Sequence, residues 1–404
     1  MGKIDKKKIL YIHQYFITPK QSGGTRSYWL SQELIKKGYN VTMLTARNNQ
    51  ETLIQRQCID GINVIYIKNS YDNSFGITKR IFSFIRFMIL STIIALKEKK
   101  VDLVFATSTP LTVGVPALIL HWFKRIQFVF EVRDLWPEVP IQMGGIKNKL
   151  VINILYQFEK IIYRKAKHII ALSPGMVDGV LKQGINSDKI SMIPNMAKID
   201  EFYIREPNVE IANKFEIDLN KFNITHFGAM GQANGLDYII NAAYILKTIG
   251  NSNFDFIFLG DGSTKNSLIQ KSKELKLENI KFIDAQSMNI VSEIINLSDC
   301  SIVSFSNIPI LRTNSPNKLF DTLSAGKPLI VNSSGWTKKM VEDNKCGAFV
   351  DPTKPEELIL LLQFWKTKPE LMEEMCKNSR NLAETKYDKS ILTKKFVKTI
   401  SKYV

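Results

Sequence analysis

The chain has 404 residues, 45% of them hydrophobic, which excludes a disordered protein and exceeds what a single core usually holds, so we expect two domains. The net charge of +17 is uneven. Residues 1–200 carry 29 Lys and Arg against 14 Asp and Glu, or +15, and residues 201–404 carry 26 against 24, or +2. The amino-terminal half is therefore expected to meet an anionic partner.

The cysteines and histidines give no sign of a metal centre. Cys58, Cys300, Cys346 and Cys376 form no C-x-x-C pair and show no metal-ligand spacing, and the chain has only four histidines. Isolated cysteines of this kind are typical of reduced, packed thiols in a cytosolic protein. We therefore expect no metal cofactor.

The first segments predict the start of a doubly wound α/β sheet. Residues 9–16 are too short and polar for the apolar core of a signal peptide, and they indicate a strand. The next loop contains Gly23 and Gly24, and a helix over 27–37 and a strand over 40–45 follow. A Gly-Gly pair after a first strand favours close approach of a ligand, although glycines also serve turns that bind nothing.

The segment 81–96 is apolar except for Arg86, with Lys79 and Arg80 before it and the lysine-rich run 97–100 after it. Its length falls short of the roughly 20 apolar residues that span a bilayer. Two interpretations stay open: a helix buried in an α/β core, or a helix that lies partly in a membrane surface with its basic flanks on anionic headgroups. The positive charge of this half favours membrane contact.

A polar cluster ends the apolar strand predicted near residues 127–132. It contains Glu131, Arg133 and Asp134. Ligands of open parallel sheets bind beyond the carboxyl ends of strands, so we expect these side chains to line a cleft between the domains. The alternative is that Arg133 and Asp134 form a local surface ion pair.

The second half repeats the theme of a strand followed by a glycine-rich turn. The strand that begins at residue 223 opens onto Gly228, Gly231 and Gly235, and a later strand ends in a turn with Gly262. The spacing only loosely matches a dinucleotide fingerprint, and no acidic residue ends the next strand about 20 positions on, which argues against NAD. Backbone amides at these turns are expected to face a phosphate.

The segment 315–332 predicts a short helix that begins near Pro316 and stops at Gly326. It places Asn317, Lys318 and Asp321 near a helix start, where free N–H groups favour an anion such as a diphosphate. Lys318 adds a positive charge, and Asp321 can accept hydrogen bonds from two sugar hydroxyls. We interpret this as a nucleotide-sugar pocket. The alternative is an ordinary surface helix with a capped start and solvated charges.

The order and spacing of these pieces resemble the GT-B glycosyltransferases of the retaining family four, almost from end to end. The matching pieces are Gly23-Gly24, Ile193–Asn195, Phe227–Leu236, Leu259–Gly262, Lys318–Asp321 and Ala325–Pro328. The resemblance implies two Rossmann-like domains that face each other across a cleft. Residues 1–200 would bind the acceptor and residues 201–386 the nucleotide sugar, with a final helix over 387–404 packed back on the first domain.

The resemblance also implies roles for individual positions, and the sequence departs from several of them. Asp321 stands where the family holds the nucleotide ribose with an acidic residue, more usually Glu. The family's other acidic residue, eight positions earlier, is replaced by Thr313. The basic pair that grips the diphosphate is replaced by Ala229 and Asn234.

We therefore assign the diphosphate to Lys318, with Arg312 as helper. The cleft histidine of the family corresponds to Arg133, which precedes Asp134. The predicted catalytic residues are Lys318, Arg133 and Asp134, the predicted donor-binding residues are Asp321, Asn317, Arg312, Gly228, Gly231 and Gly262, and the predicted acceptor-binding residues are Gly23, Gly24, Arg26 and Glu131.

A narrower likeness involves residues 23–27, 130–138 and 315–321, which resemble bacterial transferases of O-antigen and capsule assembly, including N-acetyl-L-fucosamine transferases. It implies a UDP-sugar donor, no further cofactor, and an acceptor saccharide on a polyprenyl diphosphate. It also implies a cytoplasmic protein, peripheral on the inner face of the cell membrane.

Two other classes stay open. A UDP-sugar 2-epimerase shares the two-domain architecture without needing a membrane, and a basic binding protein would take nucleic acid or membrane without catalysis. Nucleic acid is disfavoured, because the Lys and Arg residues are scattered and not interleaved with aromatics in one stretch.

Overall fold

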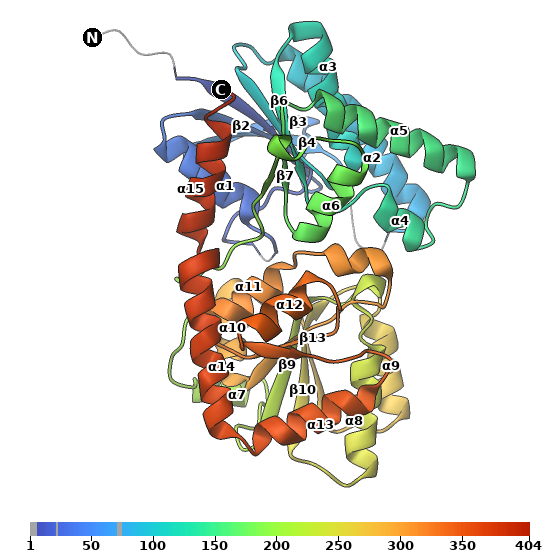
Figure 1. Ribbon diagram of the computed structural model, residues 1–404, viewed down its shortest axis with the longest axis vertical. Helices are drawn as coiled ribbons and strands as arrows, with labels where there is room; N and C mark the ends of the chain where they lie inside the picture. Colours follow the sequence, from blue (N-terminus) through green and yellow to red (C-terminus); the bar gives the residue numbers. More distant parts are fainter. Residues whose placement is uncertain (1–5, 22, 71–74) are drawn as a thin grey trace. The chain divides into compact units, whose positions relative to one another are not determined.

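The structure, a computed structural model, describes residues 6–21, 23–70 and 75–404 (Figure 1). It divides into two compact units, each built on its own sheet. The first unit comprises the residues up to Thr18, Gly24–Pro194 and Ser390–Val404, and the second comprises Pro19–Gly23 and Asn195–Lys389. The predicted α/β class, with two Rossmann-like sheets, is confirmed.

The first unit has an eight-stranded sheet of order β3-β4-β2-β1-β5-β6-β7-β8. Its strands are β1 (Lys8–Ile12), β2 (Asn40–Arg47), β3 (Ile54–Ile59), β4 (Ile62–Lys68), β5 (Leu103–Thr107), β6 (Gln127–Val132), β7 (His168–Ala171) and β8 (Ile190–Met192). All neighbouring strands are parallel except β3 and β4. Every residue of β5 is buried, as expected for a central strand covered by helices on both faces.

The antiparallel pair β3 and β4 is a hairpin that the sequence analysis did not predict. Its two-residue turn is Asp60-Gly61, with φ of 47° and 83°. Positive φ at both positions suits the right-handed twist of a hairpin, and Asp-Gly is a favoured pair for it. The strand signal was weak because five of the six residues of β3 are exposed.

Helices pack along the first sheet. They are α1 (Arg26–Lys36), α2 (Ile77–Lys97), α3 (Gly114–Lys124), α4 (Glu138–Gln142), α5 (Lys149–Lys165), α6 (Pro174–Lys182) and α15 (Lys389–Ile400), with short 3-10 turns η1 (Leu111–Val113) and η2 (Ser187–Lys189). Among the helices of the described residues, none is long and apolar enough to cross a membrane.

The residues after Lys389 complete the first unit. Phe396 on α15 is fully buried, and its ring centroid lies 5.0 Å from that of Phe105 on β5. The hydroxyl of Tyr403 lies 3.0 Å from Nδ1 of His168 on β7. The carboxyl-terminal segment therefore contributes to the core of the first unit.

The second unit has a six-stranded parallel sheet of order β11-β10-β9-β12-β13-β14. Its strands are β9 (Phe222–Ala229), β10 (Phe254–Asp261), β11 (Ile280–Ile283), β12 (Cys300–Val303), β13 (Leu329–Val331) and β14 (Gly347–Phe349). Its helices are α7 (Val209–Lys214), α8 (Asp237–Thr248), α9 (Lys265–Glu274), α10 (Met288–Leu297), α11 (Asn317–Ser324), α12 (Trp336–Asp343), α13 (Pro355–Lys366) and α14 (Pro369–Leu382), with short turns η3 (Gln232–Asn234), η4 (Pro309–Thr313) and η5 (Ala383–Tyr387).

Strand β10 shows how this sheet holds two cores. Phe254, Phe256 and Phe258 enter one apolar cluster, and Ile257 and Leu259 enter another. Successive side chains of a strand point to opposite faces, so a continuous apolar run feeds both faces of a covered parallel sheet. The apolar clusters on its two faces therefore hold the sheet in place, and the carboxyl ends of its strands keep a fixed register.

Candidate functional site

Helix α11 presents Lys318 at the carboxyl edge of the second sheet. Leu319, Phe320 and Leu323 are fully buried and fix the helix against the unit, as the sequence pattern predicted. Pro316 precedes the helix as its N-cap instead of occupying its first turn, so the helix begins at Asn317. Gly326 ends it with a φ of +62°, in agreement with the predicted stop.

The ammonium group of Lys318 rests on a buried histidine. Its Nζ lies 3.2 Å from Nε2 of His226, which is 1% exposed on β9. The other ring nitrogen, Nδ1, lies 3.2 Å from the carbonyl oxygen of Ile302. A neutral imidazole that donates from Nδ1 to this carbonyl can accept a hydrogen bond from Lys318 at Nε2. We assign this tautomer because it satisfies both nitrogens.

Burial controls the charge of both groups. It lowers the pKa of Lys318 to about 7. Burial, followed by the nearby charge of Lys318, holds the pKa of His226 well below its usual value. The imidazole therefore stays neutral at physiological pH, and Lys318 is the group of the pair whose charge changes there.

Glycines keep the space beside Lys318 open. Gly228, with a φ of +97°, lies one residue before the end of β9, and a Cβ built on it would lie 3.6 Å from Cε and 3.8 Å from Nζ of Lys318. Gly262 lies so close to the main chain of Met230 that a Cβ built on Gly262 would be 2.4 Å from the Met230 carbonyl oxygen. Gly228 is exposed, and Lys318 is partly exposed beside it. An anion can approach backbone amides and a cation at this point.

The other predicted donor-binding residues of this unit are Gly231, Asn317 and Arg312, and they lie on three different elements. Gly231 opens η3, and its N–H donates to Oδ1 of Asn234 at 3.2 Å. Asn317 is the partly exposed first residue of α11. Arg312 on η4 is exposed, and its Nη2 donates to Oδ1 of Asn307 at 3.3 Å. The role of Arg312 as helper to Lys318 stays a prediction.

Asp321 lies one turn after Lys318 on α11 and has a cationic partner. Its Oδ1 is 3.1 Å from Nζ of Lys198, and the two side chains are only 5% and 6% exposed. Burial raises the pKa of Asp321 to about 6, and Lys198 opposes this shift. The sequence analysis assigned Asp321 to a ribose and overlooked Lys198. A ribose at this carboxylate would share it with Lys198 or displace that lysine.

The first unit contains a second cation on a buried histidine. Nη1 of Arg133 lies 3.1 Å from Nε2 of His13, which follows β1 and is 2% exposed. Nδ1 of His13 lies 3.0 Å from Oγ of Ser27. Burial, followed by the charge of Arg133, lowers the pKa of His13 well below its usual value. The neutral ring therefore accepts from the guanidinium, which cannot lose its proton.

Asp134 is held by a hydrogen bond from the loop that follows β5. Its Oδ2 accepts a hydrogen bond of 2.8 Å from Oγ1 of Thr109, and burial raises the pKa of its carboxyl group. The main-chain N–H of Arg133 donates to Oγ of Ser108 at 3.0 Å. The polar cluster predicted after β6 is thus held in place by the loop that follows β5.

Arg26 and Glu131 lie inside the first unit. Nε and Nη2 of Arg26 donate to Oε1 of Glu131 at 3.0 and 2.8 Å, and the guanidinium also donates to the carbonyl oxygens of Ile193 and Pro194. The two side chains are 1% and 0% exposed. Arg26 and Glu131 were predicted to contact the acceptor, but both side chains are buried and cannot reach it. Their role is structural, because their hydrogen bonds join α1, β6 and the end of β8.

The two glycines predicted to bind the acceptor lie on either side of the division between the units. Gly23 has a φ of +129°, a conformation that suits glycine, and Gly24 leads into α1. Their contact with an acceptor stays a prediction.

Three functional candidates escaped the sequence analysis: His13, His226 and Lys198. Each histidine lies in or directly after an apolar strand, where a titratable residue is unusual, and that was the available signal. Their partners are 120 and 92 positions away, so the pairing itself was not readable. Within the described residues, no group of three or more His, Cys, Asp or Glu side chains is placed to hold a metal ion. The expectation of no metal cofactor stays a prediction.

Two family comparisons account for most of the chain. Residues 23–196 match the family described as "Glycosyl transferase 4-like domain", and residues 208–382 match "Glycosyl transferases group 1". The two halves of the chain therefore each match a domain family of glycosyltransferases. The chain is 22% identical over 265 residues to the putative colanic acid biosynthesis glycosyl transferase WcaI of Escherichia coli strain K12, and the match covers 64% of this chain and 62% of the relative. It spans about three fifths of the length of the curated relatives it matches.

Solved structures share the fold of this chain. Sucrose-phosphate synthase from Thermosynechococcus elongatus superposes with a TM-score of 0.79 and 14% identity, over 98% of this chain and 99% of that one. Alr3699/HepE from Anabaena, solved in complex with UDP-glucose, gives 0.69 and 16%, over 98% and 99%. The predicted GT-B fold is confirmed.

The buried ion pair between Arg26 and Glu131 generates a stability prediction. Arg26→Met should lower the free energy of unfolding of the first unit by about 3–5 kcal/mol, because it leaves Glu131 buried without its cation. Urea denaturation followed by circular dichroism measures this change. Arg26→Met combined with Glu131→Leu should recover part of the loss, and Glu373→Gln, in an exposed pair with Lys377, should change little. An unchanged unfolding midpoint in Arg26→Met would contradict the structural role.

Proposed function

We propose that this chain transfers a sugar from a UDP-sugar to a saccharide on a polyprenyl diphosphate, with retention of anomeric configuration. The observation that carries the proposal is Lys318, held on neutral His226 beside the exposed glycine at the tip of β9. Within the described residues no carboxylate lies within ion-pair distance of Lys318, so its charge is available to a diphosphate.

The family and the named similarities support this proposal. A group 1 glycosyltransferase domain covers the unit that holds Lys318. A solved structure of the same fold binds UDP-glucose, and a curated relative is named for colanic acid biosynthesis. The narrower resemblance to capsule and O-antigen transferases supports an N-acetyl-hexosamine donor, such as UDP-N-acetyl-L-fucosamine.

The proposed reaction is a front-face substitution. The bond between the anomeric carbon and the β-phosphate oxygen breaks, and its electron pair leaves with UDP. The acceptor oxygen bonds to the anomeric carbon on the same face, and its proton passes to a phosphate oxygen of the leaving group. Lys318 and the N–H groups at the start of α11 stabilise the developing charge on the phosphate.

Asp321 holds the nucleotide ribose in this proposal. It lies three residues after Lys318, so the two side chains project from neighbouring turns of one side of α11. Its carboxylate accepts from the ribose hydroxyls while Lys198, 3.1 Å away, keeps it ionised. Arg133 and Asp134, fixed on the first unit, remain our candidates for contacts to the sugar or the acceptor.

The face of α2 supports a membrane-bound acceptor. Phe87 on its inner side is fully buried, whereas Ile85, Ile89 and Ile93 are 43%, 50% and 45% exposed. The spacing of four places these isoleucines in one stripe, and the basic residues at both ends of the helix suit anionic headgroups. We propose that this stripe rests in the cytoplasmic surface of the cell membrane, which makes the protein peripheral there.

The first test is transfer itself. Incubation of the purified protein with a panel of UDP-sugars and a polyprenyl-diphosphate saccharide should release UDP and give a product heavier by one sugar, detected by mass spectrometry. Conversion of one UDP-sugar into another without acceptor would instead favour a 2-epimerase.

Loss of Lys318 should cripple turnover. Lys318→Ala is expected to lower kcat by roughly 10²–10³, because a preorganised charge on the departing phosphate is lost. The rate of UDP release measures this effect. Lys273→Ala removes an equal charge from the exposed end of α9 and should leave kcat unchanged. Wild-type turnover in Lys318→Ala would refute the assigned role.

Donor affinity should depend on pH through Lys318. Because the pKa of Lys318 is about 7, the ammonium is charged below that pH and must take up a proton to bind the donor above it. The affinity for a UDP-sugar should therefore be flat between about pH 6, the pKa of the Asp321 carboxyl group, and about pH 7, and it should fall by up to about ten-fold per pH unit above pH 7. Calorimetric titration measures the slope, which Lys318→Met should abolish and Lys273→Ala should keep. If the affinity of the wild type for the UDP-sugar did not change above pH 7, the proposed role of Lys318 would be contradicted.

Membrane binding should depend on the α2 stripe. Ile85→Gln combined with Ile89→Gln is expected to weaken binding to vesicles that contain phosphatidylglycerol by about ten-fold, because two partly exposed apolar side chains no longer enter the lipid. Vesicle co-sedimentation measures it. The control, Leu219→Gln with Ile249→Gln, changes side chains that are 44% and 57% exposed in the second unit. Equal binding by both variants would contradict the proposed face.

A further inference from the structure

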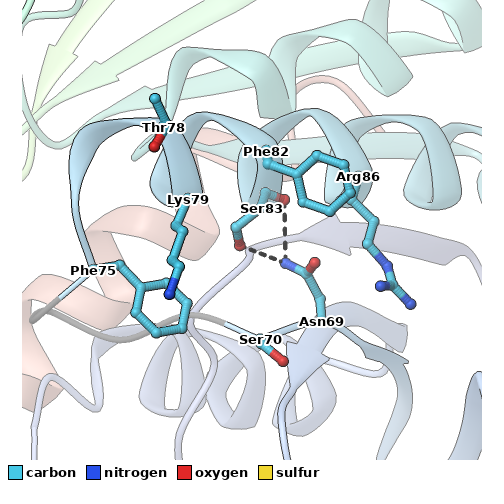
Figure 2. Close-up of a pocket in the computed structure, with 8 residues that line it drawn as sticks. All are labelled: Asn69, Ser70, Phe75, Thr78, Lys79, Phe82, Ser83 and Arg86. Atoms are coloured by element: carbon cyan, nitrogen blue, oxygen red, sulfur yellow. Dashed lines mark hydrogen bonds between the residues drawn. The ribbon is translucent and has the colours of Figure 1, made fainter.

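A groove of about 370 Å³ lies in the first unit, between the segment after β4 and the first turns of α2. Asn69 and Ser70 line it from the strand side, and Lys79 and Arg86 line it from the helix. Figure 2 shows both cationic side chains extending from α2 toward the Asn69–Ser70 segment, one on each side of Ser83. The spacing of seven residues places the two cations on one side of the helix, two turns apart.

The floor of the groove is fixed by buried hydrogen bonds. Nδ2 of Asn69 donates to the carbonyl oxygen of Ser83 at 3.2 Å and to its Oγ at 2.9 Å, as the dashed lines in Figure 2 mark. The two residues are 3% and 2% exposed. These hydrogen bonds join the helix to the end of the strand at the floor of the groove.

The charges of the groove are not neutralised within the described residues. No carboxylate there lies within ion-pair distance of Lys79 or Arg86, and Nζ of Lys79 lies 5.7 Å from the ring centroid of Phe75. The guanidinium of Arg86 is a planar fork that suits phosphate oxygens, and Lys79 adds a point charge. The electrostatics favour an anion with more than one phosphate oxygen to offer.

Apolar side chains adjoin the cations. Phe82 also lines the groove and is 67% exposed, and Ile81 and Ile85 are 46% and 43% exposed on the same helix. A ligand that fits this surface combines an anionic group with a hydrocarbon. It differs from the nucleotide, which we place in the second unit.

We propose that the groove binds the diphosphate of a lipid-linked acceptor, whose hydrocarbon continues along the exposed side of α2. The inference rests on the proposed function for the choice of acceptor. Lys79 and Arg86 each contact phosphate oxygens, and Phe82 contacts the first carbons of the chain. The groove thereby sets how far the acceptor saccharide reaches from the lipid surface.

The test uses the full chain and three probes: phosphatidylcholine vesicles that carry a polyprenyl diphosphate, vesicles of equal surface charge made with phosphatidylglycerol, and inorganic diphosphate in solution. Lys79→Gln combined with Arg86→Gln should weaken binding to the polyprenyl-diphosphate vesicles by roughly ten-fold or more. The matched control, Lys36→Gln with Lys37→Gln, removes the same charge from exposed positions at the end of α1. On phosphatidylglycerol vesicles the Lys79→Gln, Arg86→Gln variant should lose less affinity than on the polyprenyl-diphosphate vesicles, and the Lys36→Gln, Lys37→Gln control should lose little on either.

Kinetics separate this proposal from the proposed function. In the Lys79→Gln, Arg86→Gln variant, the KM for the lipid-linked acceptor should rise, with an unchanged Kd for the UDP-sugar.

If wild type binds a UDP-sugar and transfers sugar but the variant keeps its acceptor KM and vesicle affinity, the groove proposal fails and the function stands. If wild type transfers nothing yet binds the diphosphate vesicles through these two residues, the function fails and the groove stands. Equal loss on both vesicle types, or equally tight binding of inorganic diphosphate, would overturn a lipid-diphosphate site.

Discussion

A neutral, buried imidazole that accepts a hydrogen bond from a cation is the interaction on which the site geometry depends, and each unit has one. His13 holds Arg133 near the carboxyl ends of the strands of the first sheet, and His226 holds Lys318 near those of the second. An imidazole that cannot take a proton fixes a cation without neutralising it. A carboxylate in the same place would cancel the charge that an anionic substrate needs.

The sheets supply the rigidity that this arrangement requires. His226 lies in a strand whose neighbours on both sides are paired in parallel register, and apolar side chains fill both faces. Lys318 lies on a helix anchored by three fully buried side chains. Neither partner can shift without disturbing a core, so the distance between ring and ammonium group is set by the fold and not by the two side chains alone.

The sequence predicted the features that are local and periodic. Apolar strands, glycine turns and the buried face of α11 follow from spacing within a few residues, and the structure confirms them, except that the first strand, predicted over 9–16, ends at Ile12. The side-chain pairings of the two sites could not be predicted, because they join positions 92 to 120 apart along the chain. Arg26 and Glu131 illustrate the difficulty: a charged residue after a glycine loop and another at a strand end look exposed in sequence, yet they bury each other.

The path of the chain has a consequence for its synthesis. The second unit is nearly continuous in sequence, over Asn195–Lys389, whereas the first also needs Ser390–Val404. Phe396 fills the core beside β5, so the first unit lacks part of its interior until a ribosome has translated the whole of the second. The unit made first is thus finished last, and the face of β5 that contains Phe105 stays uncovered until a helix encoded hundreds of codons downstream has been made.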